Sequence, residues 1–139
     1  MQIGALAAQT SVNIETIRYY ERQGLMPAPA RSAGGRRIYD VSAAQRLIFI
    51  RRSRELGFSL VDIRELLRLA DERRVDCHKV RLLTVRHLDD IRGKIASLGR
   101  LEHALATLTD ACRLETEGAC PILDALSTAN ERFRESARR

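Results

Sequence analysis

The sequence predicts a mainly α-helical protein, in which a small N-terminal winged helix-turn-helix domain is followed by one long coiled-coil helix. Leu, Ile, Ala and Arg are abundant, whereas the 139 residues include no Trp and only 3 Pro, a composition typical of helices. Two short helical patterns joined by a tight break stand near the N-terminus, and a much longer helical pattern follows residue 76. The chain is too short for a single large catalytic fold.

The first helix pair is expected within residues 2–24. Ile3 and Leu6 share one face of a helix over residues 2–9, which ends at a break after it. Asn13 is the expected N-cap of the second helix, and Gly24 is its expected left-handed stop. In a helix-turn-helix this second helix is the recognition helix, and it carries Thr16, Arg18, Tyr19 and Tyr20.

A two-stranded wing is expected after the recognition helix, with its turn at Gly34 and Gly35. A second helix pair then follows. Ser42, with a Gln three residues later, is the expected cap of its first helix, and Ser59, with an Asp three residues later, is the expected cap of its second. The side chains that the wing offers are Arg31, Arg36, Arg37 and Tyr39.

The helical pattern that follows runs from about Lys79 to Ala111 and contains no Pro. A lone helix of roughly 50 Å cannot bury a continuous apolar seam by itself. We therefore expect a second copy of the chain as its partner, in an antiparallel coiled-coil homodimer. The seam residues follow a 3,4 spacing with one slip: Leu88, Ile91, Ile95, Leu98, Leu101, Leu105, Leu108 and Cys112.

Basic charge is concentrated near the N-terminus. The net charge is +6, and residues 1–58 carry nine Arg against four acidic residues. Guanidinium groups bind phosphate or read guanine, and tyrosine hydroxyls donate to phosphate, so this domain is expected to bind DNA. A solvated basic face is the alternative. For Tyr20, which recurs with Ile17 at helical spacing, a place in the core is an equal alternative.

Three cysteines are the candidate metal ligands. The N-terminus lacks the regions of an export signal and no long apolar run is present, so we expect a cytoplasmic protein without a disulfide framework or a membrane span. Cys77 and Cys112 are 35 positions apart on the long helix, roughly 50 Å, too far to share an ion within one chain. An antiparallel dimer would bring Cys77 of one subunit to Cys112 and Cys120 of the other, although cysteines also serve as small buried hydrophobes.

Three thiolates indicate which ion would be sensed. Thiolates select soft ions, and the helix starts at Cys77 and Pro121 favour the thiolate form. Three thiolates leave one negative charge on a divalent ion but two on a monovalent ion, which is costlier to bury. A divalent ion is therefore expected, and Hg(II) and Pb(II) are ions that tolerate three-sulfur sites. Zn(II) would require a fourth ligand, which His78 or a loop atom would supply.

Five motifs together resemble MerR-type regulators in order and spacing: Ile3–Ala7, Ile17–Glu21, Gly24–Pro27, Arg37–Tyr39 and Ile50–Leu60. The resemblance extends to Leu126. It implies a homodimer on a promoter palindrome, which represses without metal and, with metal, bends and untwists the duplex so that RNA polymerase can engage. It also implies operator contacts for Arg18, Tyr19, Arg31, Arg37 and Arg54, whereas Arg36 stands at a wing position that is often aromatic in relatives.

The resemblance also divides the chain and leaves rival functions. We expect a DNA-binding domain over 1–76, a dimerisation helix over 77–111, a metal-binding loop and short helix over 112–126, and a polar tail over 127–139. Cys77 resembles the mercury and divalent-metal sensors, whereas the gap from Cys112 to Cys120 resembles the copper sensors. On this resemblance Hg(II) ranks first, then Pb(II), Cd(II) or Zn(II), with Cu(I) or Ag(I) behind them. A Cu(I) or Ag(I) sensor, a thiol redox or electrophile sensor of this fold, and a coiled-coil scaffold are alternatives. No enzyme is expected, because no His or Asp is placed to activate a nucleophile.

Overall fold

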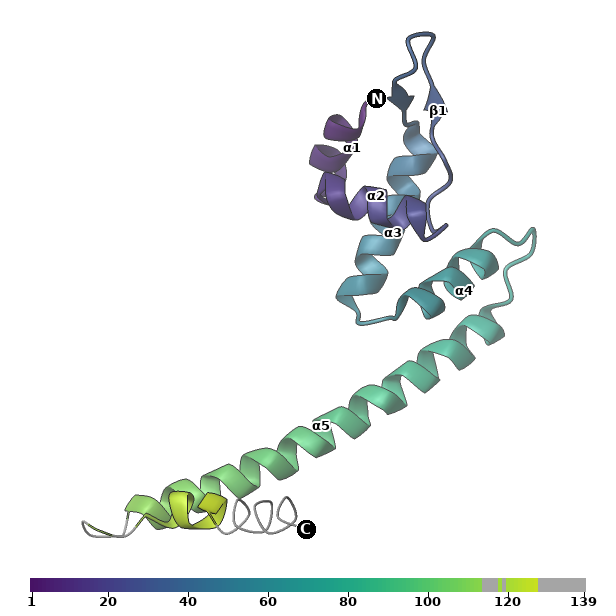
Figure 1. Ribbon diagram of the computed structural model, residues 1–139. Helices are drawn as coiled ribbons and strands as arrows, with labels where there is room; N and C mark the ends of the chain where they lie inside the picture. The colour runs from purple at the N-terminus through teal and green to yellow at the C-terminus, as the bar shows by residue number, and fades with distance from the viewer. Residues whose placement is uncertain (114–117, 119, 128–139) are drawn as a thin grey trace, which may run out of the picture. The chain divides into compact units, whose positions relative to one another are not determined.

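The computed structural model describes residues 1–113, 118 and 120–127 (Figure 1). The chain divides into two compact units, one comprising Met1–Val85 and the other beginning at Arg86. The long helix α5, Cys77–Arg113, begins in the first unit and continues in the second. Within the described ranges, none of the helices combines the length and the apolar character needed to cross a bilayer.

The first two helices form the predicted helix-turn-helix. Helix α1 spans Ile3–Thr10 and helix α2 spans Ile14–Arg22. The Asn13 side chain accepts the Thr16 backbone N–H at 2.8 Å, so the predicted N-cap is confirmed. Gly24 adopts φ +75°, a left-handed conformation that glycine reaches without strain, and the predicted stop is confirmed as well.

The wing is a short antiparallel ribbon. Strand β1 is Ala30–Arg31 and strand β2 is Arg37–Ile38, with Ala30 opposite Ile38 and Arg31 opposite Arg37. Gly35 in the connecting turn has φ +80°, and its N–H donates to the Ser32 carbonyl at 2.9 Å. The turn therefore lies at the predicted glycines, because this backbone conformation strains residues with a Cβ.

The second helix pair consists of α3, Val41–Glu55, and α4, Leu60–Ala70. Ser59 Oγ accepts the Asp62 N–H at 3.1 Å, which confirms the predicted cap of α4. The predicted cap of α3 was wrong. Asp40, not Ser42, is the N-cap, because its carboxylate accepts the Ala43 N–H at 2.9 Å and the helix begins two residues earlier. The Ser42 hydroxyl donates to that same carboxylate.

One hydrophobic core holds the first unit together. Leu6, Ile17, Leu47, Ile50 and Ile63, from four helices, are completely buried and belong to one cluster. Leu83, in the first turns of α5, belongs to this cluster too. Burying a side chain of this size stabilises a fold by about 1.5–3 kcal/mol, so the cluster fixes how the recognition helix sits on its scaffold.

In the second unit α5 continues to Arg113, slightly beyond the predicted end. The seam side chains Ile95, Leu98, Leu101 and Leu105 are each 61–64% exposed in the single chain. An apolar row of this kind is the surface that a coiled-coil partner would cover. Residues 121–127 are helical, with Pro121 as the first helical residue, as predicted. The predicted polar tail over 127–139 falls outside the described residues apart from Ser127.

Candidate nucleic-acid interface and metal centre

The outer face of α2 presents Arg18 and Tyr19. The Arg18 side chain is 50% exposed, with the exposed Glu15 carboxylate 3.9 Å away, and Tyr19 is also exposed. Thr16, one turn earlier, is half-buried, and its backbone N–H is already engaged by the Asn13 cap. A ligand that lies along α2 can therefore reach the guanidinium of Arg18 and the phenol of Tyr19.

Two of the tyrosines that the sequence analysis assigned to DNA lie in the core. Tyr20 is 7% exposed and Tyr39 is 3% exposed. The Tyr39 hydroxyl donates to Glu21 Oε1. Burial raises the pKa of Tyr39 above its ordinary value, and the neighbouring Glu21 carboxylate raises this pKa further. The position of both rings matches the packing alternative considered for Tyr20, because each has most of its surface covered by protein.

Glu21 joins the recognition helix to the wing. Its side chain is only 11% exposed, and Oε2 accepts a hydrogen bond of 2.9 Å from Arg37 Nη1. Oε1 accepts the hydroxyl of Tyr39, so both carboxylate oxygens are engaged. Met1 contacts the same residue of the wing, because its ammonium group donates to the Tyr39 carbonyl at 2.6 Å. This role of Glu21 was not predicted from the sequence, in which Glu21 stands out only as the last residue of the motif Ile17–Glu21.

Two of the remaining predicted DNA-binding arginines each make a local side-chain contact. Arg31 Nη1 donates to the Gly35 carbonyl at 2.9 Å, and Arg54 Nη1 donates to the Phe58 carbonyl at 2.9 Å. Arg36 is exposed at the wing turn. A guanidinium carries five N–H donors, so a single bond to a carbonyl orients the group and leaves other donors for a ligand.

Two arginines that the sequence analysis did not assign hold the end of the recognition helix. Arg46 Nε, from α3, donates to the Leu25 carbonyl at 2.6 Å, and Arg64 Nη2, from α4, donates to the Gln23 carbonyl at 2.6 Å. Positive groups at a helix C-terminus satisfy its open carbonyls and complement its dipole. These contacts span 21 and 41 residues, a distance over which helical periodicity carries no information.

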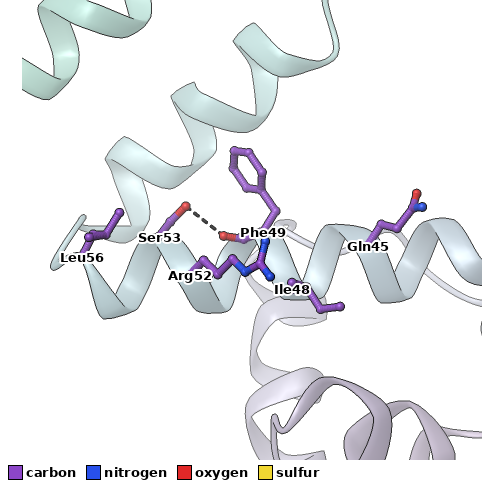
Figure 2. Close-up of a pocket in the computed structure, with 6 residues that line it drawn as sticks. All are labelled: Gln45, Ile48, Phe49, Arg52, Ser53 and Leu56. Atoms are coloured by element: carbon purple, nitrogen blue, oxygen red, sulfur yellow. Dashed lines mark hydrogen bonds between the residues drawn. The ribbon is translucent and has the colours of Figure 1, made fainter.

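Residues of α3 line an open, mostly apolar groove of about 470 Å³ (Figure 2). The hydroxyl of Ser53 in this groove donates to the Phe49 carbonyl at 2.9 Å, as the dashed line in Figure 2 marks. That hydroxyl is engaged with its own helix and faces no activating base among the lining residues. The groove is lined by Gln45, Ile48, Phe49, Arg52, Ser53 and Leu56.

Two of the three predicted metal ligands lie together. Cys112 Sγ and Cys120 Sγ are 4.0 Å apart and both residues are half-buried. Cys77 is exposed and is the first residue of α5, whereas Cys112 is the last residue but one of that helix. Among the described residues of a single chain, no group of three or more His, Cys, Asp or Glu side chains is arranged to hold a metal ion.

Polar residues flank Cys77 on both sides, Asp76 before it and His78 after it. The Asp76 carboxylate accepts the backbone N–H groups of His78 and Lys79 at 3.1 and 3.4 Å, so Asp76 caps the start of α5. The His78 side chain is exposed beside it.

The Cys112 and Cys120 pair supplies two soft sulfur ligands, which suit thiophilic metal ions.

Comparisons with known proteins agree with this arrangement. The model of the MerR HTH family regulatory proteins matches residues 1–70, and a second model, described as MerR, DNA binding, matches residues 44–108. Together these two matches cover both helix pairs, the wing and most of α5.

The relatives extend the match to the C-terminal region. The mercuric resistance operon regulatory protein of Bacillus cereus is 41% identical over 126 residues, which cover 90% of this chain and 96% of that protein. The transcriptional regulator ZntR of Escherichia coli (strain K12) is 41% identical over 128 residues, 90% of this chain and 91% of that protein. The lead(II) complex of the transcription regulator PbrR691 from Ralstonia metallidurans CH34 is 40% identical, with a TM-score of 0.80 over 91% of this chain and 98% of that one. The chain therefore belongs to the MerR family and is a metal-responsive transcriptional regulator of promoter DNA, not an enzyme.

Proposed function

We propose that the chain works as a homodimer that responds to a thiophilic divalent metal ion, with Hg(II) first, then Pb(II), Cd(II) or Zn(II). The observation that carries this proposal is the 4.0 Å separation of Cys112 Sγ and Cys120 Sγ. Two thiols at this distance, at the end of a helix and before the start of another, are held ready to bind one ion. Relatives named for mercuric resistance and a neighbour in complex with lead(II) support the choice of a divalent ion.

Cys77 of the partner subunit is the proposed third ligand. The exposed seam of α5 supplies the reason for a partner, and an antiparallel pair places the first residue of one α5 at the end of the other. Three thiolates neutralise a divalent ion more closely than a monovalent one. His78, the next residue, is the candidate fourth ligand if the ion is Zn(II).

The proposed DNA contacts come from α2, the wing and the end of α3. They are Thr16, Arg18, Tyr19, Arg31, Arg36, Arg37 and Arg54. Each arginine among them has guanidinium donors that no local contact uses, and phosphates accept such donors bidentately. We leave Tyr20 and Tyr39 out, because both are buried and the hydroxyl of Tyr39 is bonded to Glu21.

The proposed action follows from a dimer whose two domains bind one promoter palindrome. Without metal the dimer represses. With metal, the two domains bend and untwist the duplex so that RNA polymerase can engage, and this work takes place in the cytoplasm. DNA deformation costs free energy that depends on sequence, so metal must bind the activating state more tightly than the repressing state.

A titration of the purified, reduced protein with each ion tests the metal proposal. We expect Hg(II) to compete best, with one ion bound per chain and near-ultraviolet sulfur-to-metal charge-transfer bands. Cys77→Ser is expected to abolish Hg(II)-dependent transcription in vitro while leaving DNA binding by the metal-free protein unchanged. A Cys77→Ser protein that still activates with Hg(II) would show that Cys77 is not a ligand.

The same sulfur pair supports two other responses. Cys112 and Cys120 within one chain suffice for a two-thiol Cu(I) or Ag(I) sensor, and thiols at 4.0 Å can also be oxidised to a disulfide after a small approach. Cu(I)-dependent activation that survives Cys77→Ser would favour the first. Thiol counting by mass spectrometry after mild peroxide treatment, with two thiols lost and no metal uptake, would favour the second.

A further inference from the structure

A depression between α2 and the wing is lined by three arginines, one of which was not among the predicted DNA contacts. Arg18, Glu21 and Arg22 recur at helical spacing and share one face of α2. Arg37 reaches this face from β2 through its bond to Glu21. These four side chains line one depression of about 310 Å³, which we call the arginine cradle.

Both oxygens of the carboxylate in the cradle are engaged by neighbouring side chains. Glu21 is 11% exposed, with Oε2 bonded to Arg37 and Oε1 to Tyr39. Arg18 and Arg22 are exposed, and Arg37 keeps more of its side chain accessible than Glu21 does. Three guanidiniums against one engaged carboxylate therefore present a net positive, donor-rich surface.

A second carboxylate near the cradle is that of Glu15, 3.9 Å from Arg18. Its side chain is 84% exposed, so solvent and salt screen this pair and a phosphate can displace it. The ligand that such a surface recognises is a tetrahedral oxyanion, because guanidinium groups bind phosphate in a planar, bidentate manner. A helix-turn-helix and its wing contact the same duplex, so a phosphate of the DNA backbone is the source that fits this location.

We propose that Arg18, Arg22 and Arg37 bind one backbone phosphate in each domain, with Glu21 as a positioning residue that holds Arg37 in the cradle. The inference rests on the proposed DNA contacts of Arg18 and Arg37, and it adds Arg22 as a ligand and the convergence of all three on a single phosphate. Phosphate contacts of this kind fix the register of the protein on the duplex.

Ethylation interference tests the cradle directly. The probe is a duplex that the wild-type protein selects from a random-sequence pool, and ethylation of single phosphates shows which of them matter for binding. We expect Arg22→Gln to lower the affinity about tenfold and to abolish interference at one phosphate per half-site. Arg37→Gln is expected to abolish interference at that same phosphate. The affinity losses of the double variant should be less than multiplicative, because both arginines serve one ligand.

Glu21→Gln tests the positioning role. It retains the size of the side chain but removes the charge that holds Arg37, so interference at the same phosphate should weaken while the other phosphates keep theirs. Combined with Arg37→Gln, it should cause no further change at that phosphate. A merely structural role would instead weaken interference at all phosphates alike.

Arg73→Gln is the matched control, because it removes one exposed positive charge from the connector after α4 and should leave the interference pattern unchanged. The cradle is overturned if Arg22→Gln leaves the wild-type pattern, or if Arg22→Gln and Arg37→Gln affect different phosphates. A wild-type protein that selects no duplex would overturn the proposed DNA contacts as well. Arg22 and Arg37 are accessible, so replacing them should not prevent folding. Arg22→Gln and Arg37→Gln therefore test whether both arginines bind the same phosphate even if Glu21→Gln fails to fold.

Discussion

Tyr39 is the residue through which the wing and the recognition helix depend on each other. Its ring is buried, its hydroxyl donates to Glu21, and its backbone N–H and carbonyl each form a hydrogen bond with Met1. A buried hydroxyl that donates to an engaged carboxylate stabilises one arrangement of the two elements, because breaking the pair would leave a poorly solvated acceptor. The position of Arg37, which bonds to the same carboxylate, therefore depends on a buried tyrosine.

Tyr39→Phe should lower the free energy of unfolding by about 1.5–3 kcal/mol near neutral pH, because it removes one hydrogen bond to a charged group. The pKa of Tyr39 is raised in the folded protein, so the stabilisation is complete below the ordinary tyrosine pKa of about 10 and is lost as pH rises through the folded value. Urea unfolding followed by circular dichroism, at fixed protein concentration and at pH 8 and above pH 10, measures both effects.

The variant should therefore lose less stability than the wild type on going to high pH. Tyr19→Phe is the control, because it removes an exposed phenol from the same helix. Equal losses of stability in wild type and Tyr39→Phe would show that the phenol of Tyr39 does not contribute to the alkaline transition.

Residue positions were predictable from the sequence where they depend on helical period. Ile17 and Tyr20 stand three residues apart and both are buried, whereas Arg18 and Tyr19 between them are exposed. The contacts of Glu21 were not predictable. Its partners lie 16 and 18 residues away, across the wing, and local periodicity does not show which loop folds back against which helix.

Elements were predictable where a cap or a left-handed glycine marks their ends. Asn13 and Ser59 cap the helices that they were expected to cap, and the wing turns at Gly35. The cap of α3 was missed because Asp40 and Ser42 are both good N-cap residues. The sequence does not show which of them stands just before the first helical residue. The carboxylate of Asp40, whose pKa is lowered by the bond from the Ala43 N–H, accepts both that N–H and the Ser42 hydroxyl.

Asn13→Ala should shorten or fray the start of the recognition helix and lower the free energy of unfolding by about 1 kcal/mol, because the Thr16 N–H loses its acceptor. Asn13→Ser, which restores an acceptor at the same position, should recover most of the loss. Hydrogen exchange at the amides of the first turn of α2 provides the measurement. Unchanged protection in Asn13→Ala would show that the cap does not hold this turn.

At the scale of the whole molecule, one helix separates the third cysteine from the other two. Cys77 begins α5, and Cys112 and Cys120 lie 4.0 Å apart at its other end. The sequence predicts that the three thiols bind one metal ion. In a single chain, however, only Cys112 and Cys120 lie close together. The proposed three-thiolate site therefore requires a second chain, and the exposed seam of α5 is the surface available for that association.

Mixing two inactive variants tests this assembly. Neither Cys77→Ser nor the double variant Cys112→Ser with Cys120→Ser should form a three-thiolate site as a homodimer. In an antiparallel heterodimer of the two, Cys77 of one chain meets Cys112 and Cys120 of the other, so one of the two sites is complete. We expect a co-expressed and differentially tagged heterodimer to recover half of the wild-type charge-transfer intensity with Hg(II). A heterodimer with no recovered intensity would show that the three sulfurs do not converge across the dimer, whatever else holds the two chains together.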